Sequence, residues 1–418
     1  MRLVAAAFLA LAGIPQGTAR AADPIVLGMP TSLGFLEGKE GLNGVTLAVE
    51  EINARGGVKV GKEKRLLKLE AIDTRCAEPG VPVSDVLLGH EKLILEKGAK
   101  FIVFGSFRSE AAIAAMDTVA KYKVPMVLGI AMAPTVQTKV KEDPARYKYT
   151  FRSCLNAQGL VKYLAGTMDF LKAQFGFDKV FVMHQDVAWA RGTANGVVKS
   201  YFEPKGWKVT GVEAYPTGSS DFSSGLLKAR AAGAQVILPV FDMPQSGILV
   251  KQWKSTKVPA LLAGFISPLA GPGAWKTFEG KIDGAINVIF EVGNIASAKV
   301  PASAVFAAAY EKRWGAPLES GHAPAPGYES VHVLAEAIER AGTIEPDAVV
   351  AALEKTDRMG AMGRIRFAED HQVPYGVDPA QEAVGAVIQW RAGKRVVVYP
   401  PALADAKIEL PEGLKAAK

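Results

Sequence analysis

Ser109 is the residue of this sequence whose type and position first raise a question of chemistry. The apolar run Phe101–Phe104 predicts a short buried strand that ends at Gly105, and a helix is expected over residues 109–121. A hydroxyl at that point can serve as a hydrolase nucleophile, as part of a phosphate loop, as a helix cap, or as one wall of a ligand pocket. The residues around Ser109 separate these four interpretations.

The motifs that enzymes build around such a serine are not found. A nucleophile elbow, G-x-S-x-G, needs glycines where Phe107 and Ala111 stand. The nearest match to a phosphate loop, at 57–63, is one residue short and ends in Glu63, so it predicts a turn. The segment GPGAW at 271–275 lacks the last glycine of a dinucleotide fingerprint, and the 5 histidines show no metal-ligand spacing. We therefore expect no enzyme activity, no cofactor and no metal.

The two remaining interpretations of Ser109 are compatible with each other. As a helix N-cap, its hydroxyl would bond to an amide of the first turn, with Glu110 near the positive end of the helix. Ligands of open α/β sheets bind outside the carboxyl ends of the strands, next to helix N-termini. Residues 105–108 are therefore also expected to form a pocket wall.

The elements that would position this pocket alternate between strand and helix. Nearly all the predicted strands are apolar throughout, as expected for parallel sheets with helices on both faces. A polar segment at 141–153 separates two such series, which predicts two α/β lobes. The expected strands are 25–29, 65–73, 101–104 and 124–129 in the first series, and 179–184, 207–215, 235–241 and 259–264 in the second.

The chain after residue 284 departs from this alternation. Its pattern predicts a strand near 284–290, helices at 301–314, 324–341 and 345–355, and short strands at 363–367, 384–390 and 395–399. The economical interpretation is that the chain crosses again between the lobes and completes each of them. The last residues are expected to form a solvated tail.

The N-terminus has the pattern of a secretory signal peptide. Met1-Arg2 is followed by an uncharged apolar stretch from Leu3 to Ile14 and by an Ala-x-Ala cleavage site that ends at Ala21. The stretch is too short to span a bilayer, and no cysteine lies near the cleavage site to carry a lipid. We therefore expect residues 1–21 to be removed and the product to be soluble, periplasmic and not lipidated.

Charge and cysteine content add two further expectations. The formal net charge of +7 arises from basic residues spread along the chain, which argues against nucleic acid as a partner. Cys76 and Cys154 are the 2 cysteines. In an oxidising compartment they are a candidate disulfide, and two free buried thiols are the alternative.

Five segments, in order along the chain, resemble the type I periplasmic solute-binding proteins, and most closely the leucine/isoleucine/valine-binding branch that serves ABC importers. They are TLAVEEINARGGV (46–58), GSFRSEAA (105–112), VPMVLGIAMAPTV (124–136), DFSSGLLKARAAGAQVIL (221–238) and GYESVHVLAEAI (327–338). The resemblance implies an α/β fold of two Rossmann-like lobes joined by three crossovers, with a ligand cleft between them. Lobe I is expected at 24–147 plus 285–380, lobe II at 148–284 plus 381–400, and the tail at 401–418.

The resemblance also implies which residues contact the ligand. Family members hold the carboxylate of an α-amino acid with a serine after the third strand and with a threonine and backbone amides in the next loop; these positions fall on Ser109, Met132 and Ile130. In lobe II, the position of the acid that pairs with the α-ammonium falls on Ile266, so two of the family's amino-acid contacts are apolar here. The remaining expected pocket residues are Glu37, Arg108, Trp189, Phe241 and Asp242. Core packing is the alternative for Trp189, Phe241 and Ile266, and a solvated charge is the alternative for Arg108.

By this resemblance the chain is expected to be a monomeric receptor that binds a small amino-acid-like solute and delivers it to the permease subunits of an ABC importer in the inner membrane. The alternative is a ligand-sensing module of the same fold in signalling or regulation. Leucine, isoleucine and valine are expected to bind weakly. The preferred ligand, an aromatic acid or amide, is expected to stack on Trp189 and to reach Ser109 with its polar end. A cationic ligand is a further alternative, because the Glu37 and Asp242 carboxylates beside the Trp189 indole would also suit an ammonium group.

Overall fold

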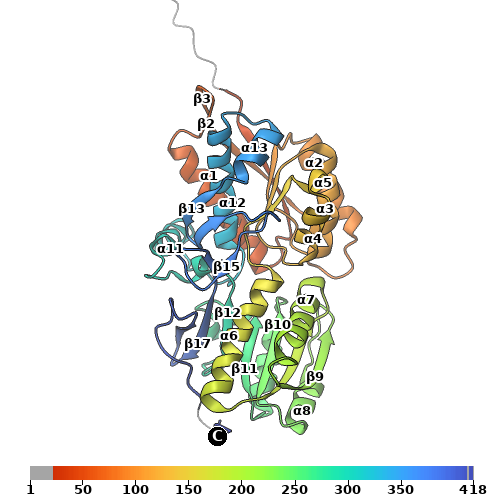
Figure 1. The fold of residues 1–418 in the computed structure, drawn as a ribbon, viewed down its shortest axis with the longest axis vertical. Helices are drawn as coiled ribbons and strands as arrows, with labels where there is room; N and C mark the ends of the chain where they lie inside the picture. Colours follow the sequence, from red (N-terminus) through yellow and green to blue (C-terminus); the bar gives the residue numbers. More distant parts are fainter. Residues whose placement is uncertain (1–21, 412–413, 418) are drawn as a thin grey trace, which may run out of the picture.

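Two mainly parallel β-sheets, each covered by helices, form two lobes that lie one above the other in Figure 1. The computed structural model describes residues 22–411 and 414–417, so the predicted signal peptide lies outside the described residues. The sequence prediction of an α/β fold with two Rossmann-like lobes is confirmed.

The first lobe contains a five-stranded sheet in the order β4-β1-β5-β6-β7, in which all neighbours are parallel. β7 was not expected from the sequence, because it is short and lies within the polar segment that separates the two series of strands. The strands are β1 (Ile25–Thr31), β4 (Leu67–Asp73), β5 (Phe101–Phe104), β6 (Met126–Leu128) and β7 (Thr150–Arg152).

Helices from both ends of the chain cover this sheet. α1 packs closely against α12, as Figure 1 shows. Gly44 permits the approach, because a Cβ at this position would lie 2.3 Å from the carbonyl oxygen of Pro324. The helices of this lobe are α1 (Leu36–Ala54), α2 (Val83–Leu95), α3 (Ser109–Tyr122), α4 (Thr135–Glu142), α5 (Pro144–Tyr147), α12 (Pro324–Ala341) and α13 (Pro346–Leu353).

The second lobe contains a seven-stranded sheet in the order β18-β17-β12-β11-β10-β8-β9. β17 joins β12 and β18 by antiparallel pairing, and the other neighbours are parallel. The strands are β8 (Lys179–Gln185), β9 (Lys208–Tyr215), β10 (Val236–Phe241), β11 (Leu261–Ile266), β12 (Ile286–Ile289), β17 (Ala386–Arg391) and β18 (Lys394–Tyr399). The helices are α6 (Ala157–Phe175), α7 (Ala188–Val197), a π-helical turn (Val198–Phe202), α8 (Ser223–Ala231), α9 (Ser246–Ser255) and α10 (Ala274–Thr277).

Smaller elements complete the molecule. The turn expected at 57–63 is the tip of a hairpin formed by β2 (Val58–Val60) and β3 (Glu63–Arg65). A four-stranded sheet in the order β13-β14-β16-β15 lies close to the first sheet, because Gln372 bridges to Arg152 of β7. Its strands are β13 (Asp357–Gly360), β14 (Gly363–Arg366), β15 (Tyr375–Gly376) and β16 (Ala383–Val384), and α11 (Pro301–Trp314) precedes it; the short 3-10 turns are Ser267–Leu269 and Val292–Ile295.

The chain crosses between the two large sheets three times. It leaves the first sheet after β7, at Arg152, and the second sheet after β12, at Ile289. It returns to the second sheet between β16 and β17, at Gly385. The first two crossings lie a few residues beyond the expected lobe boundaries at 148 and 285, since β7 and β12 each pair with the strands that precede them.

The C-terminal tail is only partly solvated, because two of its described residues are buried. Leu403 is 1% exposed and Ile408 is 4% exposed. The Gln389 side chain of β17 donates to the Glu409 carbonyl (2.6 Å) and accepts from the Glu409 amide (3.0 Å). These few apolar residues, scattered in a polar segment, are enough to hold it on the second lobe.

The candidate disulfide is contradicted, because Cys76 and Cys154 are both free and buried. The Cys154 thiol lies 3.7 Å from the Ala131 carbonyl oxygen, inside the crossing region. Cys76 lines a different space, next to Arg108 at the rim of the first lobe. Residues 22–411 and 414–417 contain no helix long and apolar enough to cross a membrane and no cluster of ligands able to hold a metal ion.

Candidate ligand-binding cleft

A cavity of about 310 Å³ lies where the two lobes meet. Residues from both sheets and from the crossing segments line it: Glu37, Phe107, Ile130, Met132, Trp189, Asp242, Phe265, Phe290 and His322. Of this space only about 20 Å³ is open to the centre of a water-sized molecule, which is room for about one water, so an organic ligand enters only when the lobes move apart. The loops that follow β5, β6 and β10 all contribute, which is where ligands of open α/β sheets bind.

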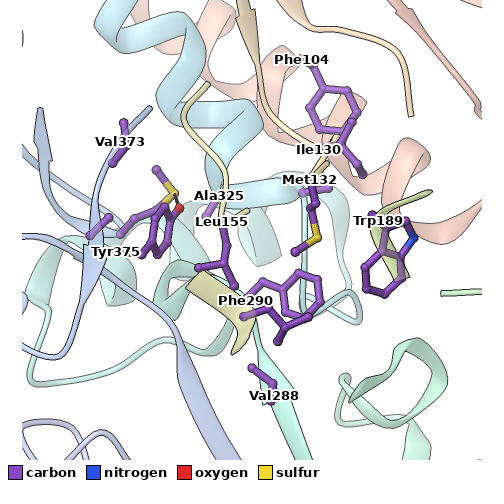
Figure 2. Close-up of a cluster of buried hydrophobic side chains, with 14 of the residues drawn as sticks. Phe104, Ile130, Met132, Leu155, Trp189, Val288, Phe290, Ala325, Val373 and Tyr375 are labelled. Carbon is purple, nitrogen blue, oxygen red and sulfur yellow. Dashed lines mark hydrogen bonds between the residues drawn. The ribbon is translucent and has the colours of Figure 1, made fainter. Parts of the chain in front are cut away.

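Aromatic rings form one side of the cavity. The Trp189 ring, at the start of α7, meets Phe265 edge-on at 6.0 Å and Phe290 edge-on at 6.2 Å between centroids. Phe265 and Phe290 lie 4.1 Å apart. Figure 2 shows Met132 reaching toward Phe290, with Trp189 beside them. The wall is therefore apolar and polarisable, which suits flat or aliphatic ligand groups.

Asp242, just after β10, is the acceptor of two donors from different lobes. Arg108 donates from Nη1 at 2.5 Å and Trp189 donates from Nε1 at 2.7 Å, both to Oδ2. The other oxygen, Oδ1, is buried and has no hydrogen-bond partner among the described residues. Gln185 orders the loop by accepting from the Asp242 and Met243 amides at 3.1 Å each.

Arg108 is charged despite its burial. Burial alone would lower the pKa of the guanidinium, but the Asp242 carboxylate outweighs it, so the pKa of Arg108 is raised. The guanidinium also stands over the rings of Phe35 and Phe107, at 5.6 and 5.1 Å from their centroids. A buried ion pair of this kind holds its geometry well, because separating the partners would leave a charge without compensation.

Glu37, in the first turn of α1, makes a second contact across the cleft. It is 3% exposed and accepts a hydrogen bond from the Ser267 hydroxyl of the second lobe. Burial raises the pKa of Glu37 to about 7; the Ser267 hydrogen bond opposes this shift and the Asp242 charge adds to it. The carboxyl therefore titrates near neutral pH when the cleft is closed.

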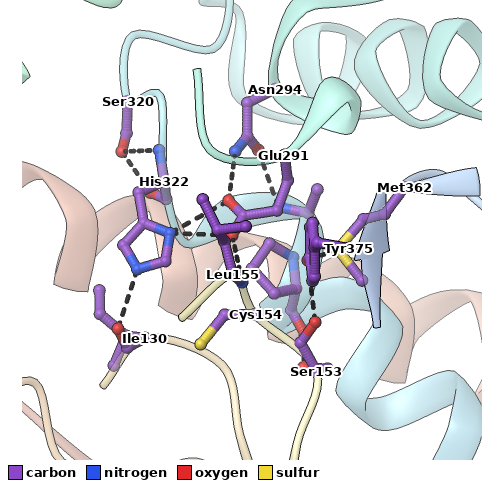
Figure 3. A network of polar contacts seen from close by, with 12 residues as sticks. Ile130, Ser153, Cys154, Leu155, Glu291, Asn294, Ser320, His322, Met362 and Tyr375 are labelled. Carbon is purple, nitrogen blue, oxygen red and sulfur yellow. Dashed lines mark hydrogen bonds and ion pairs between the residues drawn. The ribbon is translucent and has the colours of Figure 1, made fainter. Parts of the chain in front are cut away.

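A buried polar network ties the cavity to the crossings, as Figure 3 shows. His322 donates from Nε2 to the Ile130 carbonyl (2.8 Å) and from Nδ1 to Glu291 (3.0 Å). Glu291 also accepts from the Leu155 amide (3.0 Å) and from Asn294 (3.1 Å). Burial lowers the pKa of His322, but the Glu291 carboxylate, the Ile130 carbonyl and the Glu37 charge together outweigh it, so the pKa is raised, which favours the ring protonated on both nitrogens.

The predicted pocket residues fall into three groups. Glu37, Ile130, Met132, Trp189 and Asp242 line the cavity. Arg108 touches it only through its ion pair with Asp242. Ser109, Phe241 and Ile266 are placed elsewhere.

The N-cap interpretation of Ser109 is wrong. Arg108 is the N-cap of α3 and Ser109 is its first residue. The Ser109 hydroxyl accepts hydrogen bonds from the amides of Met132 (3.2 Å) and Ala133 (3.1 Å). Its function here is to fix the loop after β6, which in turn places Ile130 and Met132 at the cavity.

Phe241 and Ile266 follow the alternative of core packing. Both are fully buried and belong to the apolar cluster on the other face of the second sheet. Successive side chains of a strand point to opposite faces, so Phe265 faces the cavity where Ile266 cannot. For the same reason Asp242 reaches the cleft and Phe241 packs against Phe222 at 5.6 Å.

Phe107 lies in the loop 105–108 that was expected to form a pocket wall, and it lines the cavity. Three lining residues were not identified from the sequence. Phe265 is the direct neighbour of Ile266, which was considered, and Phe290, expected inside the strand 284–290, directly follows β12. His322 lies in the loop before α12 and carried no local signal.

Comparisons with known proteins agree with this geometry. Residues 28–383 match a family model described as a periplasmic binding protein. The chain is 27% identical over 421 residues to the Leu/Ile/Val-binding protein homolog 7 of Brucella melitensis biotype 1, covering 97% of this chain and 98% of that protein.

Solved structures with the same fold include two bound complexes. A branched-chain amino acid transporter substrate binding protein, LivJ, from Streptococcus pneumoniae in complex with isoleucine has a TM-score of 0.73 at 20% identity, covering 90% of this chain and 100% of that chain. A solute binding protein from R. palustris in complex with benzoate has a TM-score of 0.72 at 15% identity, covering 94% and 100%. At these identities the likeness concerns the fold.

Proposed function

Since the chain belongs to the periplasmic binding protein family, we propose that it is an exported solute receptor of an ABC importer. In this proposal it binds one small organic molecule between its lobes, as a monomer without enzyme activity, and presents the closed, loaded form to a permease. The predicted signal peptide supports export to the periplasm.

The observation that carries the proposal is a cavity whose walls come from both lobes and whose base is the crossing region. Contacts such as Arg108 with Asp242 and Glu37 with Ser267 form only when the lobes approach each other. A ligand that adds contacts to both walls therefore favours the closed arrangement and shifts the population toward it. Closure also excludes water from the polar contacts.

The cavity chemistry argues against the branched-chain amino acids as ligands. By the family resemblance Met132 stands where a hydroxyl is expected, and Ser109, whose hydroxyl accepts from two backbone amides, is not among the residues that line the cavity. A zwitterion would bury a carboxylate with few free donors, and an unpaired buried polar group costs about 1–3 kcal/mol. We propose a ligand with an aromatic or extended apolar body packed on Trp189.

A thermal-shift screen of the mature protein tests this function. Amino acids, aromatic acids, amides and amines are compared, since a ligand at 100 times its dissociation constant stabilises by about 2.7 kcal/mol. The best hit is then titrated into Trp189→Phe and, as a matched control, Trp253→Phe; Trp253 is equally buried but donates to the Ala260 carbonyl, away from the cavity. Binding should weaken only in Trp189→Phe.

Two results would count against the proposal. One is that no solute stabilises the protein; the other is that a solute binds equally well to wild type and Trp189→Phe. Strong stabilisation by leucine or valine would overturn the ligand argument alone. Mass analysis of the N-terminus, with the periplasmic fraction as the sample, tests export and cleavage after Ala21.

A further inference from the structure

We infer that the cavity selects a small protonated amine with an aromatic or apolar body, an inference that rests on the proposed solute-binding function. Two carboxylates, Asp242 and Glu37, face a space whose other walls are largely aromatic. The argument depends on which donors and acceptors of the cleft are free to serve a ligand.

The cationic and aromatic donors near the cavity are engaged within the protein. Arg108 donates to Asp242 (2.5 Å) and to the Ala77 carbonyl (3.4 Å). The Trp189 indole nitrogen donates to Asp242 at 2.7 Å. Both ring nitrogens of His322 are used, one by Ile130 and one by Glu291. Arg108 uses two of its five N–H groups in these bonds and is not among the residues that line the cavity, so the described residues of the lining offer a ligand carboxylate no free cationic donor.

Two backbone donors of the loop after β6 are engaged as well. The amides of Met132 and Ala133 both donate to the Ser109 hydroxyl. These two amides are therefore not available to an anion in the cavity.

Among the hydrogen-bond acceptors of the cavity, by contrast, one has no donor in the part of the chain that the structure describes. Asp242 lines the cavity, and its Oδ1 is buried and has no hydrogen-bond partner among the described residues. A buried carboxylate oxygen without a donor is costly, so a ligand N–H placed there gains both a charge-assisted hydrogen bond and relief of that cost. This oxygen points to a donor group on the ligand.

The charges of the cleft favour a cation. Arg108 is paired with Asp242, and His322 is paired with Glu291. Among the described residues the Glu37 side chain forms no ion pair of its own: it accepts from the Ser267 hydroxyl, and the His322 ring that acts on it electrostatically is already bonded to Glu291. The cavity therefore becomes net negative as Glu37 ionises, and a ligand cation restores neutrality.

The aromatic wall fits the same ligand class. Trp189, Phe265, Phe290 and Phe107 line the same cavity. Aromatic faces attract cations, with Trp the best of them, and the attraction grows when water is excluded. A compact amine with a ring or short aliphatic body satisfies the carboxylates with its nitrogen and the rings with its body.

Three probes of equal shape test the inference on the wild-type protein. Benzylamine, benzyl alcohol and benzoate share a ring and differ in the charge of the attached group. Calorimetric titration at pH 7 should show benzylamine binding at least tenfold tighter than benzyl alcohol, and benzoate weakest of the three. This comparison needs no variant and so does not depend on how mutants fold.

Variants then assign the selectivity to the carboxylates. Asp242→Asn should weaken benzylamine tenfold or more, and Glu37→Gln should weaken it less. Glu40→Gln is the matched control: Glu40 lies one turn further along α1 and accepts from the amides of Glu319 (3.1 Å) and Ser320 (2.8 Å) rather than facing the cavity. Its affinity for benzylamine should equal that of wild type.

The outcomes separate this inference from the function it rests on. Tighter binding of benzoate or benzyl alcohol, equal binding of the three probes, or failure of benzylamine to bind at millimolar concentration would each overturn the amine assignment. Stabilisation by a non-amine solute in the wider screen would leave the receptor function standing. Failure of every solute would remove both.

Discussion

Replacing Glu37 by glutamine should make closure of the ligand-free cleft less sensitive to pH. Glutamine keeps the size of the side chain and an oxygen that accepts from Ser267, but it cannot ionise. In the closed structure burial raises the pKa of Glu37 to about 7 from an ordinary value of 4.5. Opening the cleft would return the carboxyl to water and to that ordinary value.

The sign and size of the effect follow from this difference. The closed form holds a proton that the open form loses, so closure is favoured most at low pH and weakens as pH rises from about 4.5 through about 7. The full difference amounts to about 3 kcal/mol, since each pH unit corresponds to about 1.4 kcal/mol. Between pH 5.5 and pH 8 the wild-type ratio of closed to open molecules should fall by roughly 30-fold.

Small-angle X-ray scattering reports closure directly. Wild type should expand as pH rises from 5.5 to 8, whereas Glu37→Gln should change little. Burial also raises the pKa of Glu40 to about 7, but its acceptor bonds go to backbone amides before α12, so Glu40→Gln should expand like wild type. An identical pH profile for Glu37→Gln and wild type would refute the reasoning.

Three further predictions concern the residues around the cavity. Arg108→Met leaves Asp242 buried without its cation, a loss of about 3–5 kcal/mol for one-sided removal; scattering should show a more open molecule, and adding Asp242→Asn should restore closure. Ser109→Ala deprives two loop amides of their acceptor, so urea unfolding should show a loss of about 1–3 kcal/mol, and an unchanged midpoint would contradict the assigned contact. Thiol titration of the denatured, unreduced protein should find both cysteines reactive, and a missing pair of thiols would restore the disulfide.

Sequence patterns predicted helices best where particular residues mark the first and last positions of the helix. The helices expected at 157–175, 301–314 and 324–341 have the same bounds in the structure. Each ends in a glycine with a left-handed backbone, at φ values of 72°, 69° and 64° for Gly176, Gly315 and Gly342. Glycine adopts this conformation without a steric penalty, so the glycine in the sequence predicts where each of these three helices ends.

The site was less predictable because it depends on side-chain direction and on partners far away in the chain. One residue of offset exchanges Ile266 for Phe265 and moves the side chain from the cavity to the opposite face. Ser109 was expected to bond within its own helix, but its partners lie on the loop after β6. His322 is positioned by Glu291 and Ile130. Both partners are distant in the sequence, so no local pattern around His322 predicts these contacts.

Because each lobe contains segments from distant parts of the chain, its core can form only after the later segments have been synthesised. α1 needs α12 to cover its buried face, and β12 needs β17, whose Val387 pairs with Val288. Contacts between such distant segments close long loops and form late, which slows folding. Neither lobe can complete its core until most of the chain has been made. In a chain that is exported unfolded, this arrangement would delay the completion of either core until nearly the whole chain has been translated.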